Sequence, residues 1–138
     1  MQVRSAMAQT ISTARPDDTL QRAAELMKQE DAGFIPIVDG GRLLGVVTDR
    51  DIVIRCIAAG HDVRSERADH CMTPRPVTVK ADAELAEAAR LMDENAVRRL
   101  PVVEGDRLVG ILSHGNLVQA MSSDGAADRA TLGVTRGA

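Results

Sequence analysis

The sequence predicts an α+β fold made of two tandem repeats, each with the order strand, helix, strand, strand, helix. Two observations carry this prediction: the chain aligns with itself, and each copy shows a helical apolar pattern followed by a hairpin pattern. The composition agrees with a globular protein, since 44% of the 138 residues are hydrophobic and 27% are charged. One repeat is too short to cover its own sheet, so we expect the repeats to share one core about a pseudo-twofold axis.

The duplication is visible without a gap. A shift of 65 residues aligns Met7–Ile52 with Met72–Leu117, and 14 of these 46 pairs are identical. Average composition would give roughly three or four identities. The expected domains are repeat 1 at 1–60, a polar linker at 61–70, repeat 2 at 71–122, and a disordered polar tail at 123–138.

Each copy opens with a short extended piece, at 11–14 and 77–79, followed by acidic helix caps at Asp17, Asp18 and Asp82. Apolar residues then recur at helical spacing and predict one amphipathic helix in each copy. These residues are Leu20, Ala23, Ala24 and Met27 in the first copy and Leu85, Ala88, Ala89 and Met92 in the second.

A hairpin pattern follows each helix. Apolar runs at 34–38 and 43–47 flank a glycine turn, and the second copy repeats them at 100–103 and 108–112. Pro36 and Pro101 remove one ladder donor each, so we expect them at a strand edge or start. Thr48 or Asp49 in the first copy, and Ser113 in the second, can cap a closing helix, which in the first copy ends at Gly60.

The junction at 45–51 is the strongest candidate for a ligand site. A strand end followed by a helix start offers free backbone N–H groups, and Thr48 adds a hydroxyl. The Asp51 carboxylate has two acceptor oxygens, which suit the two adjacent hydroxyls of a ribose. Helix capping alone also favours Thr48 and a solvated Asp51 here, so a ligand site and a simple cap both remain open.

The duplication, the order of elements and the motifs together resemble the CBS-domain family, as a stand-alone pair of repeats forming a Bateman module. The proline strands carry part of this resemblance. The signature G-h-x-[ST]-x-x-D carries the rest and is complete in Gly45, Thr48 and Asp51. The second copy has Gly110 and Ser113 but carries Asn116 in place of the aspartate.

The resemblance implies a sensor of adenosine compounds such as AMP, ADP, ATP or S-adenosylmethionine, bound in the cleft between the repeats. In that arrangement Thr48 and Asp51 hold the ribose, while Arg98 and Arg99 of the other copy meet the phosphate. The residues expected in this site are Val46, Thr48, Asp51, Pro76, Val77, Val97, Arg98 and Arg99. Arg98 and Arg99 also fit a solvated connection between a helix and a strand.

A second, weaker site would join Ser113 and Asn116 to Gly33 and Phe34. These residues bring no cation for a phosphate and no carboxylate for a ribose. We therefore expect ligand binding to be strongly asymmetric between the two copies.

Other functions are disfavoured. A net charge of −3 and a single aromatic residue, Phe34, argue against nucleic-acid binding. No apolar run suits a leader or a membrane span, so we expect a cytoplasmic protein with no membrane partner. No catalytic motif is present, so neither an enzyme nor a required cofactor is expected.

The remaining residues with chemical potential are histidines and cysteines. His61, His70 and Cys71 match no common ligand spacing, so no metal site is expected. Cys56 and Cys71 are expected to be free thiols. The apolar closing helices and the family resemblance imply a homodimer that signals to an unidentified protein effector. The alternative is a dimerisation module with no nucleotide ligand.

Overall fold

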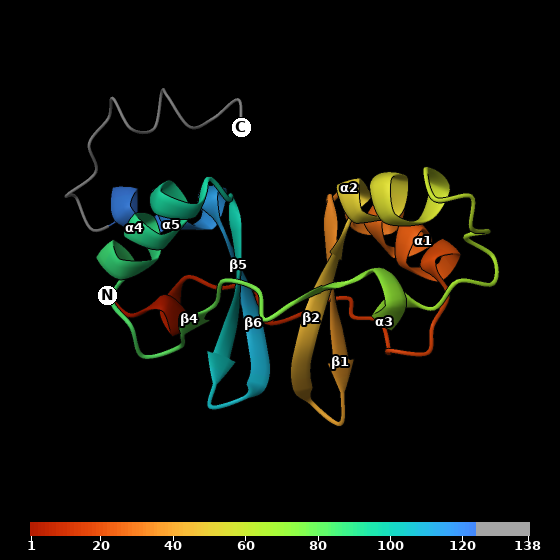
Figure 1. Cartoon of the computed structure of the whole chain (residues 1–138). Coiled ribbons are helices and arrows are strands. Elements are labelled where there is room, and N and C mark those ends of the chain that lie inside the picture. Colours follow the sequence, from red (N-terminus) through yellow and green to blue (C-terminus); the bar gives the residue numbers. More distant parts are fainter. Residues whose placement is uncertain (124–138) are drawn as a thin grey trace. The chain divides into compact units, whose positions relative to one another are not determined.

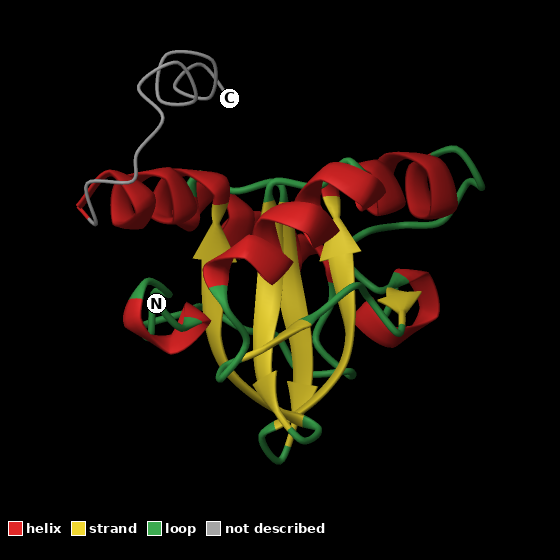
Figure 2. Cartoon of the chain, turned by 90° about the vertical axis from the view of Figure 1, so that its left-hand side faces the viewer, coloured by secondary structure: helices red, strands yellow, loops and turns green. Residues whose placement is uncertain are grey.

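The computed structural model describes residues 1–123, which form two compact α+β units (Figure 1). We call Ser12–Pro76 the first-repeat unit, and Met1–Ile11 together with the chain from Val77 onward the second-repeat unit. The predicted tail, 123–138, lies outside the described residues except for Ser123, the last residue of a helix. Figure 2 shows the mixture of helices and strands that the sequence predicts.

The two units share the order helix, strand, strand, helix, but differ in the short elements before and after it. The first-repeat unit holds α1 (Leu20–Glu30), β1 (Phe34–Asp39), β2 (Arg42–Thr48), α2 (Asp49–Asp51), η2 (Ile52–Ile57), α3 (Ala68–Cys71) and β3 (Thr73–Pro74). The second-repeat unit holds η1 (Val3–Ser5), β4 (Val79–Lys80), α4 (Leu85–Asn95), β5 (Arg99–Glu104), β6 (Arg107–Ser113) and α5 (His114–Ser123).

The helix starts differ from the sequence prediction. Thr19, not Asp17 or Asp18, is the N-cap of α1, and its hydroxyl accepts the Arg22 N–H at 3.1 Å. The Asp18 carboxylate instead accepts the backbone N–H of Arg15 at 2.8 Å, which stabilises the preceding turn. In the second repeat the N-cap of α4 is Glu84, without a side-chain capping bond, so the predicted cap at Asp82 is also wrong.

The predicted hairpins are present in both units. In β1 and β2, Phe34 lies opposite Thr48, and Arg99 lies opposite Ser113 in β5 and β6. Gly40 and Gly41 have positive φ angles of 59° and 87°, a conformation that β-hairpin turns favour and that other residues adopt with strain. The turn of each hairpin lies at one end of its strands and the following helix at the other (Figure 1).

Pro36 is the third residue of β1 and lies inside the strand, not at its start. Its carbonyl accepts the N–H of Ala14 at 2.9 Å, so the backbone edge that lacks a donor faces away from β2. Among the described residues, the pairing on this edge of β1 is the single parallel bridge between Ala14 and Ile37. The missing donor therefore falls on an edge of the strand pair, as expected for proline. Pro101 is likewise the third residue of β5, but β5 pairs with β4 as well as with β6, so the expected edge position is wrong for this proline.

Each hairpin is extended by a segment from an unexpected part of the chain. Ala8 pairs with Ile111 of β6 through two backbone hydrogen bonds of 2.8 and 3.0 Å. In the same way Thr73 of β3 pairs with Val46 of β2. The segment before each repeat in the sequence therefore packs against the other repeat's hairpin.

Each unit has its own apolar core, whereas the sequence predicted a single core shared by the two repeats. In the first-repeat unit Leu20, Ile35, Ile37 and Val47 are buried together with Cys56 and Cys71, and both cysteines are free. The core of the second-repeat unit is built from the equivalent strands and helix, and includes Val3, Val79, Leu85, Val102 and Leu112. Leu20, Ala23 and Met27 are buried as the apolar pattern predicted, but Ala24 is exposed and Leu26 is buried instead.

The closing helix of the first repeat departs from regular α geometry. After the short α2, residues Ile52–Ile57 form a π-helix, and Ala58 donates to Val53, five residues earlier, at 2.9 Å. Gly60 follows with a φ of 82°. π-Helical turns are rare and are found frequently at functional sites.

Candidate functional site

Thr48 and Asp51 form a reciprocal capping box where β2 enters α2. The Asp51 N–H donates to the Thr48 hydroxyl at 3.0 Å, and the Thr48 N–H donates to Oδ2 of Asp51 at 2.9 Å. Asp51 is 6% exposed and is the one buried charged residue among the described part of the chain. The sequence alone was also compatible with a solvent-exposed Asp51 that only supports the helix start. The burial of Asp51 excludes this interpretation.

Two further residues hold the Asp51 carboxylate, and the sequence analysis missed both. The Thr73 hydroxyl lies 3.2 Å from Oδ1 and 3.1 Å from Oδ2. Arg55 forms an ion pair with Oδ1 at 3.6 Å and donates to the Met72 carbonyl at 3.1 Å. A buried carboxylate requires such partners, because an unpaired charge in the interior is strongly unfavourable.

The second repeat forms the same capping box with the neutral Asn116 in place of an aspartate. The Ser113 N–H donates to Oδ1 of Asn116 at 3.1 Å, and the Asn116 N–H donates to the Ser113 hydroxyl at 3.0 Å. Ala8 occupies the place that Thr73 has beside β2, and Ala120 follows Asn116 by the same interval that separates Arg55 from Asp51. The carboxylate and both of its additional partners are therefore replaced together.

The cationic residues predicted to meet a phosphate lie in the second-repeat unit. Both side chains are exposed, Arg98 in the connection after α4 and Arg99 as the first residue of β5, and the Arg98 carbonyl accepts the His114 N–H at 2.7 Å. Within that unit Arg99 lies opposite Ser113, while Phe34 lies opposite Thr48 in the first-repeat unit. The pairing of Thr48 and Asp51 with Arg98 and Arg99 stays a prediction.

The apolar residues predicted to flank an adenine differ in exposure. Val46 is 8% exposed in the middle of β2, whereas Pro76, Val77 and Val97 are half-buried. Val46 and Pro76 belong to the first-repeat unit, and Val77 and Val97 to the second. Their contact with a ligand likewise stays a prediction.

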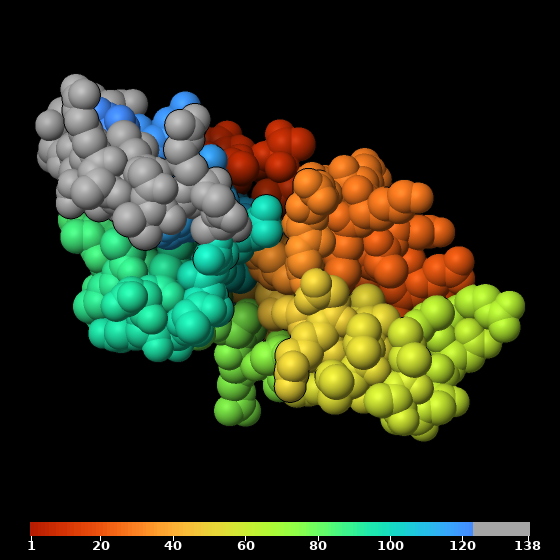
Figure 3. Space-filling model, turned by 90° about the horizontal axis from the view of Figure 1, so that it is seen from above, coloured from red at the N-terminus to blue at the C-terminus, as the bar shows by residue number. Residues whose placement is uncertain are grey.

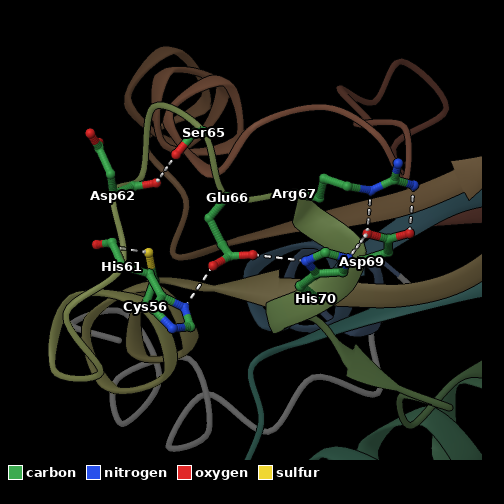
Figure 4. A network of polar contacts seen from close by, with 8 residues as sticks. All are labelled: Cys56, His61, Asp62, Ser65, Glu66, Arg67, Asp69 and His70. Carbon is green, nitrogen blue, oxygen red and sulfur yellow. Dashed lines mark hydrogen bonds and ion pairs between the residues drawn. The ribbon is translucent and has the colours of Figure 1, made fainter.

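The predicted linker is ordered around Glu66 (Figure 4). Nδ1 of His61 lies 2.6 Å from Oε2 of Glu66, and Nδ1 of His70 lies 2.8 Å from Oε1. The hydrogen bond from His70 is the main cause that lowers the pKa of Glu66. Within residues 1–123, no group of three or more His, Cys, Asp or Glu side chains is placed to hold a metal ion.

Apolar side chains are exposed on η2, the segment coloured yellow in Figure 3. Val53, Ile54 and Ile57 are 52%, 51% and 56% exposed, whereas Ile52 of the same helix is buried. We call these three residues the η2 apolar face. Among the described residues, no helix is long and apolar enough to cross a membrane.

Comparison with known proteins places these features in a family. The CBS domain model matches residues 3–57 and 68–123. The CBS domain-containing protein YhcV of Bacillus subtilis is 38% identical over 130 residues, which cover 94% of this chain and 92% of YhcV. Hypoxic response protein 1 of Mycobacterium tuberculosis is 40% identical over 103 residues, which cover 74% of this chain and 72% of that protein.

Solved structures agree. The crystal structure of Hypoxic Response Protein I with two coordinated zinc ions has a TM-score of 0.79 at 36% identity, covering 86% of this chain and 98% of that one. CBSX2 of Arabidopsis thaliana, in complex with AMP, has a TM-score of 0.78 at 30% identity, covering 90% and 98%. CBS pairs are generally regulatory, non-catalytic modules. The present chain belongs to the CBS-domain family and carries its two CBS domains in tandem.

Proposed function

We propose that this chain is a regulatory CBS pair that binds an adenine nucleotide such as AMP, with the ribose held by Asp51. In this function the protein performs no chemistry on its ligand. It reports the presence of the nucleotide to a protein effector through a change in shape or assembly.

The buried Asp51 carboxylate is the observation that carries the proposal. Its capping role needs no charge, because Asn116 makes the same box in the other repeat. Burying a charge is unfavourable, so a purely structural position would favour the neutral residue. An ionised carboxylate gains from accepting two hydroxyl hydrogens of a ribose, each in a charge-assisted bond.

The phosphate contacts are assigned to Arg98 and Arg99. Both guanidinium groups are exposed, and such groups bind phosphate in a bidentate fashion. We assign the adenine to Pro76, Val77 and Val97, with Val46 behind the ribose. The AMP complex of CBSX2, a neighbour at 30% identity, supports an adenosine ligand.

A thermal-shift panel tests the proposal. AMP, ADP, ATP, S-adenosylmethionine and NADH are compared with Zn²⁺, which is included because the Hypoxic Response Protein I structure holds two zinc ions. A ligand at ~100 times its Kd stabilises the fold by about 2.7 kcal/mol, a rise of several degrees in Tm. We expect an adenine nucleotide to give this rise and Asp51→Asn to abolish it.

Asparagine is the appropriate substitution because it preserves the capping box. Asp51→Ala would remove the hydrogen bond that the Asp51 carboxylate accepts from the Thr48 N–H and so confuse lost binding with lost stability. Asn116→Ala is the control in the other repeat; because it removes the hydrogen bond from the Ser113 N–H, its rise is measured from its own ligand-free Tm and should equal the wild-type rise. An equal rise in wild type and Asp51→Asn would refute the assignment of the ribose to Asp51.

A second candidate function is assembly alone, and the η2 apolar face favours it. Three large apolar side chains, each more than half exposed, are typical of a surface that contacts another protein. In this alternative the chain forms a homodimer and no nucleotide of the panel raises the Tm.

A further inference from the structure

We propose that Thr73 is a positioning residue whose hydroxyl sets the Asp51 carboxylate for a ribose and thereby makes the site select ribonucleotides over 2′-deoxyribonucleotides. This inference rests on the proposed function, and it assigns a specificity role to a residue outside the family signature.

The position of the Thr73 hydroxyl carries the argument. Its oxygen lies at nearly equal distances, 3.2 and 3.1 Å, from the two carboxylate oxygens of Asp51. The Thr48 N–H holds Oδ2 at 2.9 Å. The last torsion of an aspartate is soft, so a carboxylate held by one donor turns easily. A second donor placed between its two oxygens restricts that rotation.

The hydrogen-bonding capacity that remains matches a vicinal diol. A carboxylate accepts about four hydrogen bonds in total. Thr48 and Thr73 each donate one, while Arg55 at 3.6 Å is too far for a hydrogen bond and acts as a counter-charge. About two acceptor positions are left, one for each hydroxyl of a ribose.

The second repeat lacks the whole arrangement. Ala8 pairs with Ile111 where Thr73 pairs with Val46, so the hydroxyl is absent from the unit that also lacks the carboxylate. An amide in place of the carboxylate has a single acceptor oxygen. Only a carboxylate presents acceptor oxygens on both sides, so only beside Asp51 can the single hydroxyl hydrogen of Thr73 be shared between two acceptors.

The test measures the Kd of AMP and of 2′-deoxyAMP by calorimetry in wild type, Thr73→Val and Thr73→Ser. Wild type should prefer AMP by about 10-fold to 150-fold, the range of one hydrogen bond to a charged group. Thr73→Val keeps the shape and the backbone pairing of β3 but loses the donor. Its preference should fall below about 3-fold because the carboxylate no longer holds both hydroxyls. Thr73→Ser restores the donor and should restore the preference.

Two controls separate the possible failures. Ala8→Thr adds a hydroxyl at the equivalent place and should leave both affinities unchanged. Asp51→Asn should abolish AMP binding. If Asp51→Asn binds AMP like wild type, the assignment of the ribose to Asp51 fails, and if wild type itself binds no adenine nucleotide, the proposed function fails.

The positioning role fails alone if Asp51→Asn abolishes binding while Thr73→Val keeps the wild-type preference. It also fails if Thr73→Val weakens AMP and 2′-deoxyAMP by the same factor, since that result marks a merely structural residue. Should Thr73→Val not fold, Thr73→Ala provides the same ratio. A wild-type preference in Thr73→Ala would overturn the proposal.

Discussion

Asp51 shows how one residue can serve both folding and binding. The capping box satisfies backbone N–H groups at the start of α2, and the same carboxylate is held by Thr73 and Arg55. Local spacing predicted Thr48 as an N-cap but not the reciprocal bond from Asp51, although a threonine followed three residues later by an acid is a helix-start pattern. The Thr73 contact spans 22 residues of sequence, so no local pattern could reveal it. Comparing the two repeats at this position, Thr73 against Ala8, would have been the only available signal.

Gly45 is predicted to be intolerant of any side chain. A Cβ at this residue would lie 2.6 Å from the Thr73 carbonyl oxygen and 2.9 Å from Sδ of Met72. Because backbone cannot move away cheaply, Gly45→Ala should destabilise the fold by about 1 to 3 kcal/mol in urea unfolding.

Gly115 provides the matched control. It lies in α5, where an added Cβ would meet Oγ of Ser113 at an ordinary 3.7 Å. Gly115→Ala should therefore stabilise the protein, by about 0.5 to 1 kcal/mol. Equal stabilities of Gly45→Ala and wild type would show that β3 does not approach β2 as described.

Cys56 and Cys71 are predicted to react slowly in the folded protein. Burial is the main cause that raises the pKa of both thiols, and the thiolate is the reactive form. A disulfide-exchange reagent at pH 8 should label neither thiol quickly in buffer and both in denaturant. One rapidly labelled thiol in buffer, or fewer than two after denaturation, would contradict this packing.

The linker between the repeats gives a prediction at the scale of an element. The Glu66 pKa is lowered from its ordinary 4.5, chiefly by the hydrogen bond from His70. The unfolded state therefore binds more protons near that pH, and the free energy of unfolding falls as the pH drops through the folded-state pKa. Glu66→Gln removes this contribution, so its stability should depend less on pH between about 3 and 5.

Urea unfolding of both proteins across this range measures the effect. Asp62 and Asp69, whose pKa values are lowered by Arg64 and Arg67, contribute equally to both proteins and cancel in the difference. A Glu66→Gln profile parallel to wild type would show that the His70 contact is not formed in solution.

The sequence predicted which helices and hairpins form, but not the N-caps of α1 and α4 or the π geometry of η2. The helices and hairpins follow from apolar periodicity and glycine turns, which report burial directly. The caps at Asp17 and Asp18 were wrong because several polar residues precede α1, and only the tertiary path decides that Thr19 is the N-cap. The π-helix of η2 has no pattern of its own in the sequence, since a π turn uses the same residue types as an α turn.

At the scale of the whole molecule, the η2 apolar face predicts self-association. Val53, Ile54 and Ile57 expose large side chains, and covering them with a second copy would remove apolar surface from water. Light scattering should give about twice the mass of 14.7 kDa. Ile54→Glu should give the monomer, while Arg42→Glu, at an exposed charge on β2, should not. A wild-type monomer at micromolar concentration would contradict the prediction.

The sequence also predicted the tandem duplication but not the composition of each unit. The alignment of the copies begins at Met7, and residues 1–11 belong to the unit that contains repeat 2. Similarity between copies reports common ancestry of the segments, whereas packing decides which hairpin each segment joins. The bridge of Ala8 to Ile111 depends on a contact between distant parts of the chain, which periodicity does not encode.

Calorimetric titration of the full chain with AMP counts the nucleotide sites. We expect close to one site per chain, because only the first repeat supplies a carboxylate at the ribose position, Asp51. Asp51→Asn should abolish binding, and Asn116→Ala should leave the affinity and the stoichiometry unchanged. Two equal sites per chain, or binding that survives Asp51→Asn but is lost in Asn116→Ala, would contradict the account.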